Sequence, residues 1–113
     1  MKIVTLGVSD IGTVSQRAAA AFEGRKQGAR ISFASPELLF RVLTTKRWNI
    51  VRAMTGAGPL SIRETARRVD RDVKAVHRDV HALLDAGILR KTDVGQVEFP
   101  FDAIRVDVML EPA

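Results

Sequence analysis

Apolar residues recur at intervals of three and four positions between residues 73 and 86. Because an α-helix turns once every 3.6 residues, this spacing predicts an amphipathic helix with one side facing the core. Gly87 is expected to end the helix, since glycine adopts the left-handed conformation without a steric penalty. The predicted core-facing residues are Val73, Val76, Val80, Leu83 and Leu84. The opposite side is predicted to be polar and largely basic, with Lys74, His77, Arg78 and His81.

A shorter helix is predicted just before it, over residues 61–69. Ser61 and Glu64 have the S-x-x-E spacing of a capping box, in which the serine side chain accepts a hydrogen bond at the helix start. The break between the two helices ends at Asp72, whose carboxylate is placed to cap the second helix. The first helix has its small or apolar residues on one side, at Ile62, Ala66 and Val69.

Residues 88–99 are predicted to form a two-stranded hairpin around the loop 93–95. A three-residue loop with glycine in the last position fits a hairpin with a bulge. Pro100 ends the hairpin, and residues 103–110 then alternate between apolar and polar as a final strand. This strand is expected to pair with N-terminal strands, either in the same chain or across a dimer. Its apolar face would comprise Ile104, Val106, Val108 and Leu110.

Residues 1–34 predict a strand, a helix and a second strand. The first strand, over residues 2–8, is rich in β-branched side chains, and the second covers residues 30–34. Between them, residues 11–26 predict a helix whose alanine-rich side permits close packing, either on the domain or across a dimer. The inner positions of that helix are expected to be Val14, Ala18, Ala21 and Phe22.

Two further helices are expected before the segment at 61–69. Ser35, Pro36 and Glu37 supply a cap, a proline in the first helical position and an acid in the first turn. Thr44 or Thr45 is placed to cap the next helix, which then runs toward a glycine-rich loop. The residues spaced for burial are Leu38, Leu39, Val42 and Leu43 in one helix and Trp48, Val51 and Met54 in the other. Trp48 is expected to anchor either the core or an interface.

Composition favours a soluble, intracellular protein with a polyanionic partner. The 113 residues contain no cysteine, so neither a disulfide nor a thiolate metal site is expected. No apolar run approaches the length of a membrane span, and the first residues do not resemble a signal peptide, so a cytoplasmic location without membrane contact is expected. The net charge is +5. Residues 1–59 carry most of this excess, with 9 Lys and Arg against 3 Asp and Glu.

The predicted helix pair and hairpin resemble a known class of regulators. The string L-L-D-A-G-I at residues 83–88 matches the end of the recognition helix in winged helix-turn-helix transcriptional regulators of the MarR and ArsR kind. Asp70 is a departure, because many such domains place a glycine in that turn. The segments F-A-S-P-E-L-L, L-T-T-K-R-W, R-D-V-K-A-V-H-R-D-V and F-D-A-I-R-V-D are more closely similar to a group of small prokaryotic predicted MarR-like regulators, from about Arg30 to Leu110.

The expected fold class is therefore α+β. A winged helix-turn-helix domain with a C-terminal strand would occupy residues 35–113, and residues 1–34 would form a strand–helix–strand extension that takes part in dimerisation. Residues 73–86 would be the recognition helix and residues 88–99 the wing. A helix with one buried and one basic face, preceded by a short helix, is what binding in the DNA major groove requires.

Nine residues are candidates for contact with DNA. Arginine and lysine donate to guanine, and histidine and alanine read other features of base edges, so the recognition helix offers Lys74, Ala75, His77 and Arg78. Phosphate contacts fix the register without carrying sequence information, and the candidates for them are Ser61, Arg63, Arg71, Arg90 and Lys91. Asp79 would repel phosphate, so a salt bridge within or between helices is expected for it instead.

Metal binding and catalysis find little support in the sequence. His77 and His81 stand four residues apart, as two zinc ligands on a helix do, but Arg78 occupies the position of the glutamate in H-E-x-x-H and no cysteine completes a site. His81 has Asp85 one turn on as an alternative partner. No glycine-rich phosphate loop or catalytic triad is present, so we expect no enzymatic activity, cofactor or metal.

The sequence thus predicts a homodimeric, sequence-specific regulator that binds double-stranded DNA and acts as a repressor. One alternative keeps the winged domain but makes it an antitoxin-like or other interaction module whose main partner is a protein. A second alternative is RNA or nonspecific nucleic-acid binding, which the basic N-terminal half would support.

Overall fold

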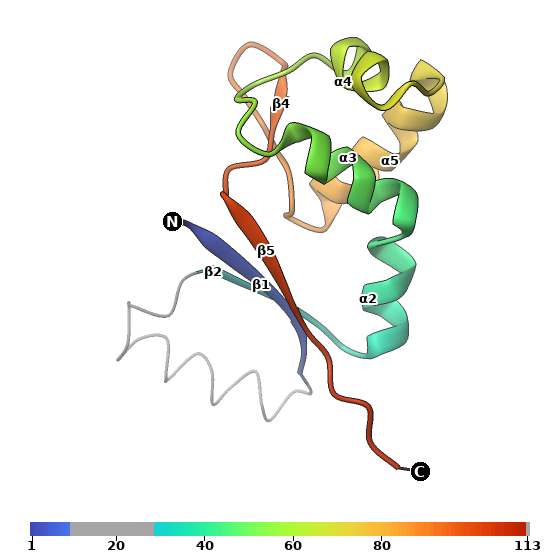
Figure 1. Cartoon of the computed structure of the whole chain (residues 1–113), viewed down its shortest axis with the longest axis vertical. Helices are drawn as coiled ribbons and strands as arrows, with labels where there is room; N and C mark the ends of the chain where they lie inside the picture. The colour runs from blue at the N-terminus through green and yellow to red at the C-terminus, as the bar shows by residue number, and fades with distance from the viewer. Residues whose placement is uncertain (10–28, 113) are drawn as a thin grey trace.

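The computed structural model describes residues 1–9 and 29–112, which form four α-helices, a small parallel sheet and a hairpin (Figure 1). The predicted α+β class is confirmed at this level. The helix expected over residues 11–26 lies outside the described residues. The helices are α2 (Pro36–Val42), α3 (Thr45–Met54), α4 (Ile62–Val69) and α5 (Val73–Asp85). The strands are β1 (Ile3–Val8), β2 (Ala29–Phe33), β3 (Arg90–Lys91), β4 (Val97–Glu98) and β5 (Ala103–Asp107).

The parallel sheet joins the two ends of the chain. Its strand order is β2-β1-β5, with β1 parallel to both neighbours. Leu6 is fully buried and lies opposite Ile31 of β2 and Val106 of β5. The last strand therefore pairs within its own chain, which decides between the two partners that the sequence left open. Asp102 reinforces this pairing, since its carboxylate accepts a hydrogen bond of 2.7 Å from the backbone N–H of Lys2.

The apolar face predicted for the last strand is only partly buried. The strand ends at Asp107 instead of Leu110, and the Leu110 side chain is 98% exposed. Val106 is 39% exposed although it lies beside Leu6 in the sheet. The alternation gave the right face for Ile104 and Val106, but β1 ends at Val8, so residues beyond Val108 have no residue of β1 to pair with.

Helices α3, α4 and α5 pack together with the hairpin around a common core. Buried side chains of α3 and α5 meet there with the apolar segment that comes after α5 and with the hairpin. Three residues predicted to be buried are exposed: Leu38, Trp48 and Val73, at 39%, 42% and 41%. Val73 is the first residue of α5, and the buried stripe of the helix begins three residues later, at Val76. The core residues of this part are Ile50, Val51, Met54, Leu60, Ala66, Val76, Val80, Leu83, Ile88, Leu89, Val97 and Phe99.

The predicted helix caps form as the sequence indicates. Ser35 and Thr44 accept backbone hydrogen bonds at the starts of α2 and α3, and Ser61 does so at α4. The Asp72 carboxylate accepts two, from the backbone N–H groups of Lys74 and Ala75. Each cap satisfies N–H groups that have no partner inside the helix. The turn residue Asp70 adopts the left-handed conformation, with φ of 53°, at the position where glycine is common in winged domains.

The hairpin has the predicted loop. Arg90 pairs with Glu98 and Lys91 with Val97. The backbone N–H of Thr92 donates to the carbonyl oxygen of Gln96 at 2.8 Å, which leaves residues 93–95 as the loop, and Gly95 has a φ of 82°. The segment before α4 joins the hairpin through Leu60, which exchanges two backbone hydrogen bonds of 2.8 Å with Val97. A third extended segment thereby fixes the base of the hairpin against the helices.

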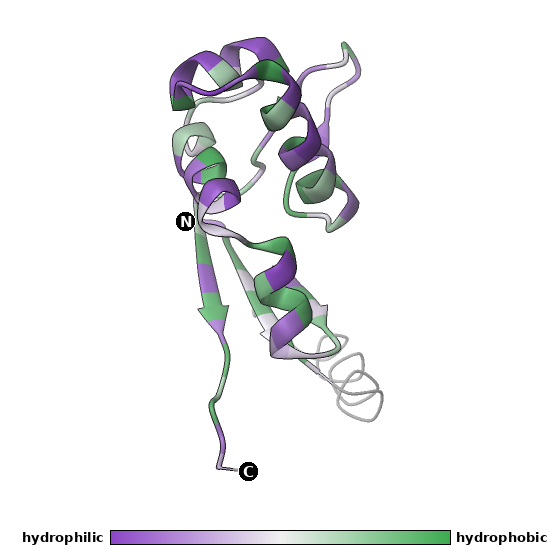
Figure 2. Ribbon diagram, turned by 90° about the vertical axis from the view of Figure 1, so that its right-hand side faces the viewer, coloured by the Kyte–Doolittle hydropathy of each residue, from purple (hydrophilic) through white to green (hydrophobic). Residues whose placement is uncertain are grey.

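The two halves of the described molecule lie end to end. Figures 1 and 2 show α3, α4, α5 and the hairpin grouped at one end, with the parallel sheet and α2 at the other. Beyond β5 the chain extends away from the body toward the C-terminus. Among the described residues, no helix has the length and apolar character needed to cross a bilayer.

Candidate nucleic-acid interface

Helix α5 separates its apolar and basic side chains as its spacing predicts. Val76, Val80 and Leu83 are fully buried, whereas Lys74, His77 and Arg78 are exposed on the other side. Ala75 is half-buried between the two sides. Within the described parts of the chain, neither Lys74 nor Arg78 has an ion-pair partner. The structure therefore brings three of the predicted base-facing residues together on one accessible surface.

Asp79, the acid in the middle of α5, turns away from this surface. Its carboxylate receives hydrogen bonds from Arg47 Nε at 3.0 Å and from Arg71 Nη2 at 2.9 Å. The side chains are mostly buried, with exposed fractions of 19% for Arg47, 14% for Asp79 and 22% for Arg71. Burial alone would raise the pKa of Asp79, but the hydrogen bonds and charges of the two arginines outweigh it and lower the pKa below its ordinary value. The predicted interhelix salt bridge is confirmed.

Arg47 extends this contact to a third helix. Its Nη1 group donates to the carbonyl oxygens of Val42, at 3.0 Å, and Arg41, at 3.3 Å, both at the end of α2. One guanidinium thus holds the end of α2, the start of α3 and the middle of α5 together. No role was predicted for Arg47 from the sequence. A signal was present nonetheless, because Asp79 has no basic residue three or four positions away and had to find its partner on another element.

Arg71 does not join the exposed basic residues. It was predicted to contact phosphate, but its guanidinium is drawn inward to Asp79, and its Nη1 atom is buried without a hydrogen-bond partner. Arg71 comes from the turn between α4 and α5, so its pairing with Asp79 fixes the turn against α5. This geometry favours a positioning role over direct contact with a ligand.

The start of α4 presents a mixed surface. Ser61 accepts a hydrogen bond from the backbone N–H of Glu64, and Arg63 is exposed. The Glu64 carboxylate pairs with Arg67 and Arg68, which replaces the second half of the predicted capping box. The hydrogen bond from Arg67 is the main reason that the pKa of Glu64 falls to about 2. These two arginines were not among the predicted site residues, although their spacing from Glu64 indicates helix-surface pairs.

The hairpin contributes one cation without an ion-pair partner in the described part of the chain. Lys91 is exposed, whereas Arg90 pairs with Glu98 on the neighbouring strand. Between the strands, Thr92 accepts a hydrogen bond of 3.1 Å from the backbone N–H of Gln96, which closes the loop. The hairpin thus holds Lys91 on a short, hydrogen-bonded strand.

His77 and His81 contact each other on α5. Their ring centroids lie 4.2 Å apart with the planes tilted by 39°. His81 therefore packs against His77, one turn before it. In the described ranges, no group of three or more histidine, cysteine, aspartate or glutamate side chains is arranged to hold a metal ion.

Comparison with known proteins places the chain in a family. No curated protein matches it. The family model described as HVO_A0114 matches residues 42–106, which run from the end of α2 through α3, α4, α5 and the hairpin into β5. The match covers more than half of the chain and includes Arg47, Arg71 and Asp79 as well as the exposed basic surface. The chain belongs to the HVO_A0114 family.

Proposed function

We propose that this protein is a winged helix-turn-helix transcriptional regulator, similar to MarR-like proteins, that binds double-stranded DNA with sequence preference and acts as a repressor. Helices α4 and α5 and the turn between them form the helix-turn-helix, in which α5 is the recognition helix. The β3–β4 hairpin is the wing. Lys74, His77 and Arg78 face base edges in the major groove. Arg63 and Lys91 contact phosphates on either side.

One observation carries this proposal: α5 presents cations to solvent that have no ion-pair partner in the described chain, while its central acid is withdrawn and neutralised. Lys74 and Arg78 are exposed, and Asp79 is held by Arg47 and Arg71 on the inner side. An ordinary solvated helix places acids and bases on the same surface, where they pair one turn apart. Here the central acid pairs on the inner side, and the one exposed acid of α5, Asp85, stands at its last residue. The surface around Lys74 and Arg78 is therefore left attractive to a polyanion.

The attachment of the hairpin supports its assignment as a wing. The backbone bridge between Leu60 and Val97 joins the hairpin to the segment just before α4. The hairpin and the helix-turn-helix are therefore parts of one packed unit, in which Val97 and Leu83 are both fully buried. A wing fixed in this way keeps Lys91 at a constant distance from α5, as simultaneous contact with groove and backbone requires.

Fluorescence anisotropy tests the proposal directly. The protein is titrated against duplex DNA from upstream of its own gene and against a scrambled duplex of equal length, at two salt concentrations. We expect a preference for the native duplex of about a thousandfold that persists as salt rises. Equal and steeply salt-dependent binding to both duplexes would show phosphate contact alone. That result, or no binding, would overturn the proposal and favour a protein-interaction role.

A charge-matched pair of variants identifies the reading surface. K74A/R78A should weaken binding to the native duplex by about 10- to 100-fold or more, because base contacts are lost, and should weaken binding to the scrambled duplex much less. R41A/R52A removes the same charge from α2 and α3, where both side chains are exposed, and should preserve the ratio of the two affinities. If both variants lower the two affinities equally, α5 does not read bases.

A further inference from the structure

The outer edge of β5 has no strand partner in the described structure. The sheet order β2-β1-β5 places β5 at one side, so half of its backbone hydrogen-bonding groups face outward. Exposed sheet edges of this kind invite pairing with another chain unless they are short, bulged or strongly charged. The edge carries Arg105 and Asp107 on one face of the sheet and Ile104 and Val106 on the other. Its charges are therefore of opposite sign and adjacent.

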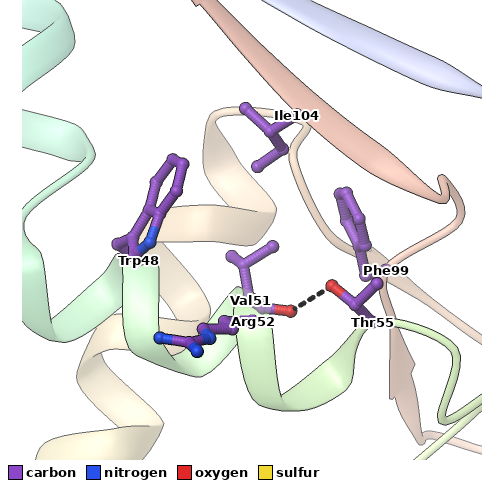
Figure 3. A pocket seen from close by; sticks show the side chains of 6 residues that line it. All are labelled: Trp48, Val51, Arg52, Thr55, Phe99 and Ile104. Atoms are coloured by element: carbon purple, nitrogen blue, oxygen red, sulfur yellow. Dashed lines mark hydrogen bonds between the residues drawn. The ribbon is translucent and has the colours of Figure 1, made fainter.

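The apolar face of β5 borders two pockets. Ile104 lines one of about 380 Å³ together with Trp48, Val51 and Phe99, and Figure 3 shows Ile104 and Trp48 at its margin. Val106 lines a second pocket of about 240 Å³, which shares Trp48 and extends to Phe40 of α2. Phe40 is 57% exposed. Two pockets that share Trp48 thus border the apolar face of β5, one toward α3 and the other toward α2.

The chain beyond β5 adds apolar residues that its own fold does not cover. Met109 and Leu110 are 75% and 98% exposed, and Val108 packs only partly against the core. Val108 and Leu110 continue the alternation of Ile104 and Val106, so an extension of β5 would place all four on one face. A strand laid alongside β5 would supply the missing hydrogen bonds and cover this apolar surface.

We propose that the protein forms a dimer in which β5 pairs antiparallel with β5 of a second copy, with the two-fold axis at Val106. The two sheets then join into one. Ile104 lies opposite Val108 of the second copy, and the two Val106 side chains lie opposite each other. The apolar faces of both strands remain on the side of α2 and α3.

Charge selects this register among those that keep the apolar faces together. With the axis at Val106, Arg105 lies opposite Asp107 in both directions, which gives two cross-strand pairs of opposite sign. Moving the axis to Arg105 would place two arginines opposite each other, and moving it to Asp107 would place two aspartates together. Like charges at directly opposed positions destabilise a sheet. An axis between two residues would turn one apolar face toward the other side of the sheet.

Asp107 already faces a cation of its own chain. Arg30 reaches from β2 across Gly7 of β1 and lies 3.9 Å from the Asp107 carboxylate. A Cβ atom at Gly7 would stand only 2.1 Å from Arg30 Nη2, so the glycine provides room for the guanidinium. In the dimer, Asp107 would lie between Arg30 of its own chain and Arg105 of the second copy. This inference does not depend on DNA binding, since none of these residues lies on α4, α5 or the hairpin.

Single-cysteine crosslinking tests both the dimer and its register. The chain has no cysteine, so V106C introduces one thiol, which would face its own copy across the two-fold axis. Mild oxidation should convert nearly all V106C protein to a covalent dimer. V108C is the matched control, because it keeps Arg105 and Asp107 and residue 108 would be displaced by four positions from its copy, about 14 Å away, too far for a disulfide. A monomeric V106C protein, or faster crosslinking of V108C, would overturn the proposal.

Light scattering on the unmodified chain completes the test. At about 10 µM the unmodified protein should show twice the 12.4 kDa mass of one chain. V106K should show the mass of one chain, because two lysines would meet on the apolar face of the dimer. Circular dichroism of V106K should be unchanged, since Val106 is partly exposed in the single chain. A monomeric unmodified protein, or a V106K protein that is folded and still dimeric, would contradict the proposal.

Discussion

The two ends of the described molecule differ in what their surfaces leave unpaired. At the helical end, α3, α4, α5 and the hairpin bury their apolar side chains among themselves, and the exposed surface of α5 is basic. At the sheet end, α2 and β5 expose Phe40 and Val106, and the C-terminal residues Met109 and Leu110 are exposed as well. Unpaired cations attract a polyanion, whereas an open strand edge beside apolar side chains favours another polypeptide. The difference underlies our proposal of two separate binding surfaces, one for DNA and one for a second copy of the chain.

The largest expected effect comes from removing the carboxylate that positions α5. D79A leaves Arg47 and Arg71 partly buried without their partner, so we expect the free energy of unfolding to fall by about 2–4 kcal/mol. DNA affinity should fall with it, because α5 is no longer fixed against α2 and α3. Dimer formation should persist in the folded fraction, since β5 is not involved. Chemical denaturation, anisotropy and light scattering measure the three quantities.

If D79A lost dimerisation and DNA binding together while remaining folded, the two surfaces would not be separate. D85A provides a matched control, because Asp85 is an exposed acid at the end of the same helix. It should change the free energy of unfolding by less than about 0.5 kcal/mol.

The same carboxylate should also affect how the free energy of unfolding depends on pH in acid. Its pKa is lower in the folded chain than the ordinary value near 3.9 that applies when unfolded. The stabilisation is therefore complete above about pH 4 and is lost as pH falls through the lower, folded pKa. In D79N the free energy of unfolding should be smaller at neutral pH and should decline less steeply in acid.

Denaturation between pH 2 and pH 6 measures this difference. Glu64, with a pKa of about 2, titrates in both proteins, so the difference between the two curves isolates Asp79. Parallel curves would show that Asp79 has the same pKa in both states.

The sequence predicted the helical end better than the sheet end, and the reason is the range of the interactions. The caps at Ser61 and Asp72 join residues two or three positions apart, so local spacing specifies them. The pairing of Asp79 with Arg47 spans 32 positions, and the parallel pairing of β5 with β1 spans about 100. No local pattern gives the partner in such contacts. Trp48 shows the same limit, because its helical spacing fits burial but the sheet end leaves it on an open pocket.

A smaller effect is expected at the cap of α4. In S61A the backbone N–H of Glu64 loses its side-chain acceptor, which should lower the free energy of unfolding by about 1 kcal/mol. S61G, which leaves the N-terminal backbone more accessible to water, should lower it by only a few tenths. The ratio of native to scrambled duplex affinity should hold in both variants if Ser61 acts only as a cap. A selective loss for the native duplex would instead give Ser61 a direct role at the interface.

The smallest effect concerns the turn that separates α4 from α5. Asp70 holds φ at 53°, a conformation that is unfavourable for residues with a side chain and open to glycine. D70G should relieve that strain but also give the unfolded chain more freedom, so a net gain of about 0.5 kcal/mol is expected. D70A keeps a Cβ in the same conformation without the short polar group, and it should be less stable than the unmodified chain. Because the backbone N–H of Asp70 bonds to the carbonyl oxygens of Ala66 and Arg67, the turn should keep its shape in both variants, and DNA affinity should stay constant. Thermal denaturation of the three proteins should therefore rank glycine above aspartate and aspartate above alanine. A reversed order would mean that the Asp70 side chain itself stabilises the turn.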